Sequence, residues 1–429
     1  MEAYDTIVIG GGPAGMAAAL AAASLRLNAE CGMRNAELED ENVSHYAEFH
    51  DEIGGGNPIP NSPRVALIER APVLGGILNQ CTHTGFGLAY FGEELTGREY
   101  AQRFVTRVES SDVEVFTDTM VLSIDIDRIV TISGANTGFR RLQTRAIILA
   151  TGCRERPIGA LPITGSRPSG IFTAGAAQKM INLGGYDIGS NFIILGSGDV
   201  GLIVARELAM RGKNVIAVIE KETICGGLER NRINCLEKYN IPLVTRATVA
   251  EIHGMPRITG VTMIDLNSGE SQLIDCDALI TSVGLIPERE LLDTLNEHQE
   301  DAECSIPNSP QGVPDWLFLC GNAAFVHDAV DDVTLESERV GRNAVLNAEC
   351  GMRNTENSEC GMRNAELIDK NASRSAELNG ESYGDNSIPN SEFRIPNSQG
   401  VLCLACPKGC IAVKTEGGWS GLACGRTEP

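Results

Sequence analysis

Two glycine-rich turns constrain the fold of this chain of 429 residues more than any other feature of its sequence. One turn spans residues 10–15 and the other spans 196–201, and each has glycine at its first, third and sixth positions. Each turn follows a short apolar run typical of a buried strand and precedes a run typical of a helix. The pattern predicts two units in which a strand, a tight turn and a helix N-terminus hold the pyrophosphate of a dinucleotide.

An acidic residue at the end of the next strand completes such a unit, about 20 residues after the turn. Residues 215–220 fit this description and end in Glu220. We expect Glu220 to accept a hydrogen bond from a ribose hydroxyl and to repel a 2′-phosphate, which favours NAD over NADP. In the first unit the matching strand ends in Glu69, which stands much further from its turn than the pattern allows.

Repeated sequence explains that distance. The pattern at residues 29–38 returns in part at 349–354 and 359–367, and Ile-Pro-Asn-Ser occurs four times. Both patterns have a period of seven residues, as the translation of a tandem repeat of seven bases does. We infer three insertions foreign to the fold, at 28–62, 296–310 and 346–400. Their composition predicts disordered surface loops, and without the first of them Glu69 lies at the required distance from its turn.

Net charge and cysteine content bound the function classes. The formal net charge is -22, and most of it lies in the insertions, so it carries little information about function. The rest of the chain is still acidic, which argues against a nucleic-acid binder, and no apolar run reaches the ~18 residues of a membrane-spanning helix. The N-terminus has no basic segment before its first apolar strand, so we expect a cytoplasmic protein whose 14 cysteines are thiols or metal ligands.

Three later motifs carry a resemblance to a family. Residues 146–152, 279–284 and 317–322 look like strands of the flavoproteins with two dinucleotide-binding domains, the pyridine nucleotide-disulfide oxidoreductase-like superfamily. The resemblance implies that the first unit binds FAD and that the second binds NAD, with NADP less favoured. In the family an Asp follows the third motif and contacts the flavin ribityl chain. Here that residue is Asn322, whose amide can still form hydrogen bonds to hydroxyl groups.

The same resemblance implies the fold and its domain organisation. We expect an α/β protein with two Rossmann-like, three-layer nucleotide-binding domains, the NAD-binding domain being inserted in the FAD-binding domain. The expected segments are 1–160 and 287–345 for the FAD-binding domain, 161–286 for the NAD-binding domain, 346–400 for a repeat-derived linker and 401–429 for a short Cys-rich tail.

Site residues follow from matching the family motifs to this sequence. The residues expected to bind FAD are Gly10, Gly12, Pro13, Ala14, Gly15, Glu69, Arg70, Gly76, Thr151, Gly152, Gly321 and Asn322. The residues expected to bind NAD are Gly196, Gly198, Asp199, Val200, Gly201, Glu220 and Gly284.

A narrower resemblance rests on residues 74–81, 150–157 and 173–178. These segments are similar to the small flavoprotein that accompanies glycerol-3-phosphate-dehydrogenase-type oxidases. They are also similar to flavoprotein subunits of sarcosine oxidase, opine oxidase and cyanide synthase. The resemblance implies a dehydrogenase or oxidase partner subunit.

The disulfide reductases of the superfamily carry a redox cysteine pair two and seven residues after a Gly-Gly that follows the acidic strand. Here those positions are Leu78 and His83, and a Cys-x-x-Cys in the second unit is also missing. We therefore predict an enzyme without a redox-active disulfide. By this count His83, with Cys81 close by, lies in the turn next to the flavin, and these two are the candidate catalytic residues. His83 either tunes the flavin or relays a proton, or it is a hydrogen-bonded loop residue.

A cluster of four cysteines near the C-terminus is the candidate metal site. Cys403, Cys406, Cys410 and Cys424 have the spacing C-x2-C-x3-C-x13-C. Four thiolates at this spacing suit one [4Fe-4S] cluster or one tetrahedral zinc ion, and a metal-free tail is the alternative. The stretch resembles a small uncharacterised Cys-rich protein usually encoded beside flavoproteins of this kind, and the N-terminal cluster segment of molybdopterin oxidoreductases.

These observations lead to one functional prediction and two alternatives. We predict an FAD-dependent oxidoreductase that moves electrons between NAD(H) and a partner dehydrogenase or a small-molecule donor or acceptor. The first alternative is a flavin oxidoreductase that acts directly on a small amine or hydroxy acid. The second is a non-catalytic or degraded flavoprotein subunit.

Overall fold

The computed structural model describes residues 1–25, 63–297, 313–353, 402–405, 411–415 and 418–421. Residues 1–361 form one compact unit, and residues 362–429 form a second unit that is described separately. The predicted insertion at 28–62 lies wholly outside the described residues, and most of the other two insertions does as well.

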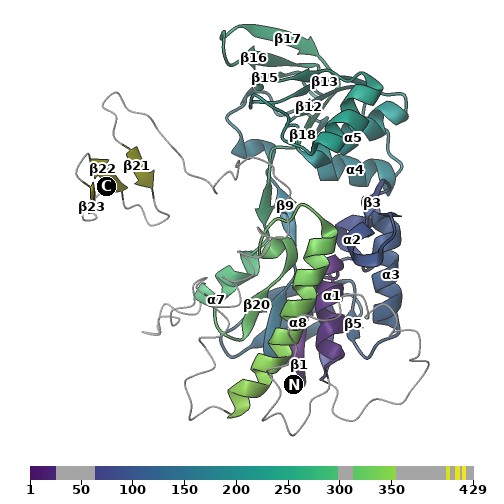
Figure 1. Ribbon diagram of the computed structural model, residues 1–429, viewed down its shortest axis with the longest axis vertical. Coiled ribbons are helices and arrows are strands. Elements are labelled where there is room, and N and C mark those ends of the chain that lie inside the picture. Colours follow the sequence, from purple (N-terminus) through teal and green to yellow (C-terminus); the bar gives the residue numbers. More distant parts are fainter. Residues whose placement is uncertain (26–62, 298–312, 354–401, 406–410, 416–417, 422–429) are drawn as a thin grey trace. The chain divides into compact units, whose positions relative to one another are not determined.

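The first sheet of the large unit contains strands from both ends of that unit (Figure 1). Its strands are β1 (Glu2–Ile9), β2 (Val65–Ile68), β5 (Glu114–Phe116), β6 (Thr119–Ile124), β7 (Ile129–Gly134), β8 (Gly138–Leu149) and β20 (Leu317–Leu319). Their order is β5-β2-β1-β8-β7-β6, and β20 also pairs with β8. The pairs that join β5, β2, β1, β8 and β20 are parallel, whereas β6, β7 and β8 form an antiparallel meander.

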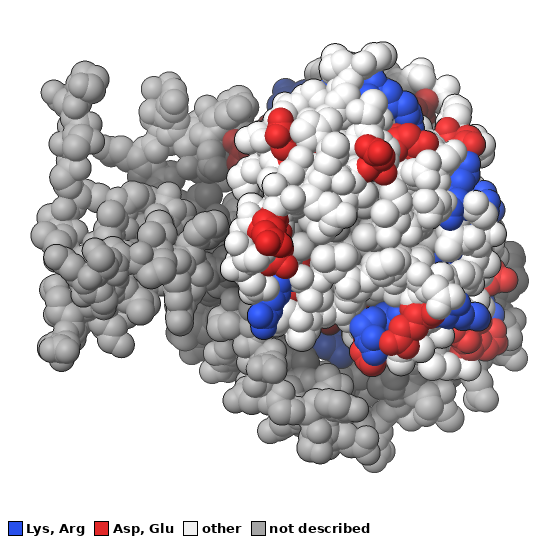
Figure 2. Space-filling view, turned by 90° about the horizontal axis from the view of Figure 1, so that it is seen from above, with Lys and Arg blue, Asp and Glu red and all other residues white. Residues whose placement is uncertain are grey.

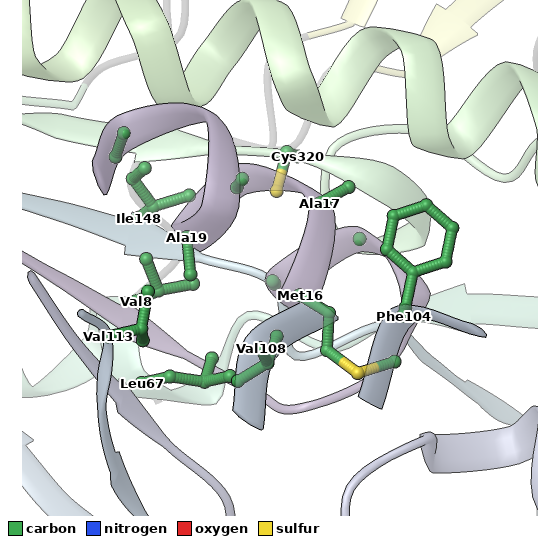
Figure 3. Packing of buried hydrophobic residues seen from close by; sticks show 14 of the residues in the cluster. Val8, Met16, Ala17, Ala19, Leu67, Phe104, Val108, Val113, Ile148 and Cys320 are labelled. Carbon is green, nitrogen blue, oxygen red and sulfur yellow. The ribbon is translucent and has the colours of Figure 1, made fainter. Parts of the chain in front are cut away.

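Three helices cover this sheet: α1 (Pro13–Ala23), α3 (Gly97–Glu109) and α8 (Val330–Arg353). Eight of the eleven residues of α1 are buried, and they are mostly alanine and glycine, so neighbouring backbones approach it closely. Met16 packs near Phe104 and Val108 of α3, and Val8 and Ile148 of the sheet lie in the same cluster (Figure 3). A helix that is apolar all round is stable because it is enclosed on all sides.

Arg64 anchors the start of β2 in the sheet. Its backbone N–H donates to Asp5 Oδ2 at 2.8 Å, and its guanidinium lies 2.9 Å from Glu114 Oε2 and 4.2 Å from the centroid of the Tyr4 ring. These contacts reach β1 on one side of β2 and β5 on the other. They therefore tie the residue that precedes β2 to both neighbouring strands.

The second sheet has five parallel strands in the order β11-β18-β12-β13-β14. They are β11 (Ile171–Thr173), β12 (Asn191–Leu195), β13 (Asn214–Ile219), β14 (Leu243–Val244) and β18 (Ala278–Thr281). Helices α4 (Ala174–Asn182) and α5 (Asp199–Met210) pack on one face. A sheet of β10 (Thr164–Gly165), β15 (Ala247–His253), β16 (Gly260–Asp265) and β17 (Ser271–Asp275) packs on the other face.

Two short strands connect these parts of the chain. β9 (Cys153–Glu155) follows the first sheet, β19 (Leu285–Pro287) follows the second, and they pair antiparallel. The remaining short elements are η1 (Gly76–Gln80), β3 (Thr84–Phe86), α2 (Leu88–Phe91), β4 (Leu95–Thr96), η2 (Ile158–Ala160), α6 (Glu229–Asn231), the π-helix η3 (Arg232–Leu236), η4 (Glu237–Tyr239), η5 (Glu290–Leu292), α7 (Asp293–Glu297) and η6 (Gly321–Ala323). The α/β prediction with Rossmann-like parallel sheets is confirmed, and the exact domain boundaries stay predictions.

The described part of the small unit is an antiparallel sheet of β21 (Leu402–Ala405), β22 (Ile411–Thr415) and β23 (Gly418–Gly421). Cys403 stands opposite Val413 in its register, and its side chain is not described. Cys406, Cys410 and Cys424 lie outside the described residues. The predicted metal site therefore stays a prediction.

At two insertions the expected disordered loop does not begin where predicted, because helices continue into the inserted segments. The third insertion was expected to begin at residue 346, but α8 continues to Arg353. Ala344 and Val345, just before that limit, are buried in the core, and Ala348, just after it, packs against the core, so the helix is held by the core on both sides of residue 346. Residues 296 and 297 likewise belong to α7 and not to a loop.

The crossing of α1 and α8 gives a stability prediction. A Cβ atom added at Gly341 would overlap the backbone oxygen of Ala18. In an open helix Gly→Ala stabilises by about 1 kcal/mol, but here we expect Gly341→Ala to lower the free energy of unfolding by about 1–3 kcal/mol, because the helices must move apart. Urea denaturation measures the change.

Gly159→Ala is the matched control, since no atom lies within 4 Å of the added Cβ. Its effect should stay within about 0.5 kcal/mol. Stabilisation by Gly341→Ala would contradict the close crossing of the two helices.

Candidate functional site

The first glycine turn joins β1 to α1. Gly10 has a φ of 112°, and a Cβ at this residue would overlap the oxygen of Ala150, so only glycine fits. A Cβ at Gly15 would overlap the oxygen of Gly10, which lets α1 pack directly on the turn. Gly12 is the N-cap of α1, Pro13 is its first residue, and no side chain caps this end. The turn therefore presents a helix N-terminus that suits an anionic group.

Glu69 fixes this turn from the end of β2. Its carboxylate is buried and accepts hydrogen bonds from the backbone N–H of Gly11 at 2.6 Å and of Ala71 at 2.7 Å. The neighbouring Arg70, also predicted to contact FAD, is exposed. The structure thus brings Glu69 onto the glycine turn, as the unit requires.

A second Gly-Gly closes over the first turn. Gly76 has a φ of 55°, and a Cβ at this residue would lie 2.9 Å from the Cα of Gly12. Ala14, next to Pro13, packs closely on Gly321. A Cβ atom added at Gly321 would lie 2.6 Å from the Cβ of Ala14. Side chains are therefore excluded on two sides of the turn, which leaves a backbone-lined cradle.

The predicted ribityl-binding residues form contacts with the chain itself. Asn322 Oδ1 accepts from the backbone N–H of His327 at 3.0 Å, and its Nδ2 donates to the sulfur of Cys153 at 3.7 Å. The backbone N–H of Gly321 donates to Glu336 Oε2 at 2.9 Å. Residues of η6, β9 and α8 that are far apart in sequence therefore meet at this place.

Thr151 and Gly152 lie where β8 leaves the first sheet. Thr151 Oγ1 donates to the backbone oxygen of Glu288 at 2.6 Å, and the N–H of Glu288 donates to the oxygen of Gly152 at 2.9 Å. The backbone oxygen of Gly284, which has a φ of 110°, accepts from the N–H of Arg156 at 3.0 Å. These residues hold the two connecting strands together.

The second glycine turn repeats the first one. Gly196 has a φ of 97°, and a Cβ there would overlap the oxygen of Ser282. A Cβ at Gly201 would lie 2.8 Å from the Cβ of Ser282, and the N–H of Gly201 donates to Ser282 Oγ at 3.1 Å. Gly198 is the N-cap of α5, and the exposed Val200 follows Asp199 in its first turn.

Glu220 binds this second turn as Glu69 binds the first. Its Oε2 accepts from the N–H of Ser197 at 2.9 Å and from Ser197 Oγ at 2.6 Å. Burial opposes the charged form, but hydrogen bonds from the backbone of Glu222 and from Ser197 outweigh it and lower the pKa of Glu220. The carboxylate is therefore charged at neutral pH, the state that repels a 2′-phosphate.

Glu220 is followed by a Gly-Gly at residues 226 and 227, just as Glu69 is followed by Gly75 and Gly76. The sequence analysis missed this pair. The N–H of Gly226 donates to Ser197 Oγ at 2.7 Å. Asp199 Oδ1 accepts from the N–H of Leu228 at 2.8 Å and from Asn231 Nδ2 at 2.7 Å. The signal was the spacing from the acidic residue, which matches the spacing from Glu69 to Gly75 and Gly76.

Cys81 and His83 end the turn that follows η1. The Cys81 thiol is buried, and burial together with Glu207 raises its pKa to about 12, so it stays protonated at neutral pH. His83 is half-buried beside Phe86, at 5.0 Å between ring centroids. Burial, and then Arg206, lower the pKa of His83 to about 4, and no described residue hydrogen-bonds its buried Nδ1. At neutral pH its imidazole is therefore uncharged.

Residues 80–82 also touch helices of the second sheet, which the sequence analysis did not foresee. Gln80 Nε2 donates to the backbone oxygen of Gly175 at 2.8 Å, and Thr82 Oγ1 donates to Glu207 Oε1 at 3.3 Å. No sequence motif marks these residues, because they are neighbours only in the folded chain.

Free thiols are spread over the described part of the chain, at Cys81, Cys153, Cys225, Cys235, Cys276 and Cys320. Within those limits no group of three or more His, Cys, Asp and Glu could hold a metal ion, and no helix is long and apolar enough to cross a membrane. On the face shown in Figure 2, Lys and Arg are interspersed with Asp and Glu.

Comparison with known proteins places this geometry in context. A family model described as pyridine nucleotide-disulphide oxidoreductase matches residues 4–334. An alkyl hydroperoxide reductase subunit of Staphylococcus aureus is 25% identical over 350 residues, which cover 81% of this chain. Its counterpart in Staphylococcus epidermidis is 24% identical over 349 residues, with the same coverage. The chain spans 59% of the length of these relatives.

Solved structures share the fold. Thioredoxin reductase of T. acidophilum superposes with a TM-score of 0.57 at 19% identity, covering 82% of this chain and 99% of that one. Lactococcus lactis thioredoxin reductase gives a TM-score of 0.55 at 18% identity, with coverages of 81% and 98%. L-proline dehydrogenase from P. horikoshii gives 0.50 at 18% identity, with coverages of 90% and 61%. At these identities the likeness concerns the fold alone.

The position of His83 gives a prediction for its titration. We expect a pKa near 4, well below the ordinary value of 6.5, because burial and the positive charge of Arg206 both oppose protonation. Proton NMR of the histidine ring signals as a function of pH measures it, and His83→Gln assigns the signal among the six histidines. A midpoint near 6.5 would contradict the buried, uncharged ring.

Proposed function

The chain belongs to the pyridine nucleotide-disulphide oxidoreductase family, and on that basis we propose that it moves electrons between NAD(H) and a partner protein or small-molecule acceptor through FAD. One observation carries the proposal. Two complete glycine turns, each bound by its own buried glutamate, lie in one compact unit. An enzyme that transfers hydride between two dinucleotides needs two such sites.

The residues of the first turn fit the pyrophosphate and ribose of FAD. Gly10 and Gly76 leave a cradle in which a Cβ atom would clash, and α1 presents its N-terminus there, with Gly12 as its N-cap. Glu69, already held by the N–H of Gly11, is placed to accept from a ribose hydroxyl. Bound FAD supplies the ability to accept a hydride and to pass its electrons on.

The second turn is assigned to NAD. The charged Glu220 favours a ribose with free hydroxyls over a 2′-phosphate. Lys221, beside it, is exposed and lies 3.4 Å from Glu222, so its charge is shared with another carboxylate. NAD is therefore the preferred partner of this turn.

His83 is the side chain that we assign to the reaction. Its uncharged imidazole can hold or release one proton in the turn beside the flavin position, at a ring nitrogen that no described residue occupies. Cys81 has a packing role in this proposal, because a buried and protonated thiol is a poor nucleophile.

The electrons are proposed to move without a redox-active disulfide. Leu78 and His83 stand at the two positions that carry the cysteine pair in the disulfide reductases of the superfamily. The second unit, residues 161–286, also contains no Cys-x-x-Cys. Both placements of the pair are therefore missing from this sequence.

The electron partner is proposed from the narrower resemblance of residues 74–81, 150–157 and 173–178. It is a dehydrogenase or oxidase subunit, as for the small flavoprotein beside glycerol-3-phosphate-dehydrogenase-type oxidases and for the sarcosine oxidase, opine oxidase and cyanide synthase subunits. The four tail cysteines, Cys403, Cys406, Cys410 and Cys424, are proposed to hold a [4Fe-4S] cluster or zinc.

The visible absorption spectrum of the anaerobically purified protein tests the function. We expect a flavin band that bleaches when NADH is added, because NADH held at the second turn would supply a hydride to FAD held at the first. A broad shoulder that remains after subtraction of the flavin spectrum would identify an iron–sulfur tail. A protein that takes up no FAD on reconstitution, or whose flavin does not respond to NADH, would overturn the proposal.

Alkylation of thiols tests the absence of a redox disulfide. The protein is treated anaerobically with or without NADH, denatured in an alkylating reagent and weighed by mass spectrometry. We expect equal masses, since no cysteine pair exchanges electrons with the flavin. Two additional alkyl groups after NADH would identify a redox disulfide, and a sample reduced with dithiothreitol calibrates the full thiol count.

A further inference from the structure

Three polar side chains of the second Rossmann-like domain converge on the turn that follows η1. Gln178 and Asn182 lie four residues apart on α4, and Glu207 lies on α5. Their partners are Gln80, the last residue of η1, and Thr82 in the turn. We call these five residues the junction.

Hydrogen bonds of the junction form a continuous network. Asn182 Nδ2 donates to the backbone oxygen of Gln80 at 2.9 Å and lies 3.1 Å from Glu207 Oε2. Thr82 Oγ1 lies 3.3 Å from Asn182 Nδ2 and 3.3 Å from Glu207 Oε1. Gln80 Nε2 lies 3.2 Å from Gln178 Oε1. Glu207 therefore accepts hydrogen bonds from both domains, from Thr82 of the first and from Asn182 of the second.

The burial of Glu207 needs an explanation. Its side chain is 8% exposed, and none of the ion pairs found among the described residues includes it. A buried carboxyl group without a counter-ion costs stability, and an apolar side chain would fill the same space at lower cost. A buried carboxyl group that costs stability is typical of a functional site, so we expect a functional role for Glu207.

We propose that Glu207 is a positioning residue, which holds residues 80–83 against the second domain and so fixes the turn that faces the flavin. This inference rests on the proposed function, because it assigns the turn to the flavin site. Glu207 acts through Thr82 and Asn182 and touches neither cofactor. By holding Thr82, Glu207 fixes the position of His83, the next residue in the chain.

Several charged or titratable groups surround Glu207. Arg206 precedes it on α5, Cys81 lies in the turn, Cys235 lies on η3, and Arg211 donates to Asn182 Oδ1 at 2.9 Å. Burial raises the pKa of Glu207, although hydrogen bonds from Asn182, Thr82 and Gln178 and the charge of Arg206 act in the opposite direction.

Because burial raises the pKa of Glu207, the equilibrium between the closed and the open junction depends on pH. When the junction opens, the carboxyl group is hydrated and its pKa returns to the ordinary value. A raised pKa in the closed form means that the closed form binds the proton more tightly, so protonation favours closure. The closed junction is fully supported below the ordinary pKa and weakens as the pH rises through the raised value. Glu207→Gln, which is always uncharged, should stay closed throughout.

Hydrogen–deuterium exchange of the flavin-free protein tests the proposal without relying on activity. At each pH the exchange rate of a peptide covering residues 78–84 is compared between wild type and Glu207→Gln. We expect a ratio near one at low pH that rises several-fold as Glu207 ionises. Glu207→Ala should speed exchange on the order of tenfold at every pH, since both acceptors are lost.

Glu270→Gln is the control, because it removes an exposed carboxylate elsewhere in the second domain. Its exchange in residues 78–84 should match that of wild type. A wild-type to Glu207→Gln ratio that does not change with pH would overturn the proposal. Equal exchange in wild type and Glu207→Ala would also overturn it.

The FAD-loaded protein then separates the two proposals. If Glu207 positions the turn, the rate of flavin reduction by NADH should fall at high pH in wild type but not in Glu207→Gln. Identical pH profiles in the two proteins would overturn the role of Glu207 and leave the proposed function intact. Failure of wild-type flavin to react with NADH would overturn the function, while the exchange results would still decide the role of Glu207 in holding the turn.

Discussion

Each of the two sites depends on a carboxylate that binds the glycine turn of its own domain. Glu69 accepts from Gly11, and Glu220 accepts from Ser197, so the end of one strand is tied to the start of the helix beside it. Hydrogen bonds with a charged partner contribute about 1.5–3 kcal/mol. They hold the backbone of each turn in place beside the helix N-terminus, together with the close packing of the glycines on Ala150 and Ser282.

Those parts of the structure that local sterics dictate could be predicted from the sequence. Gly10 and Gly196 have positive φ values, and a Cβ at either would overlap a backbone oxygen, so the glycine spacing directly reveals the turns. The short apolar runs before the turns also predicted buried strands, because such runs are typical of strands covered on both faces. Even Glu69 could be found, because the repeats identified the residues that separate it from its turn.

Features that depend on tertiary contacts could not be predicted. Glu207 sits in an ordinary helical stretch, and only the fold brings it to Thr82. Asn322 was expected to face a cofactor, yet its amide also joins Cys153 to the backbone of His327. α8 continues past residue 346 to Arg353, and Ala348 packs against the core, a tertiary contact that the repeat pattern does not reveal.

The contacts of Arg64 have a consequence for how the chain tolerates change. They tie the residue before β2 to both neighbouring strands, and β2 itself pairs with both, so β2 has contacts of its own besides the covalent link back to α1. Chain termini are best tolerated where the flanking elements are held by their own contacts. The span between residues 25 and 63 is therefore a natural place to open the chain, for a circular permutant or for two fragments that reassemble.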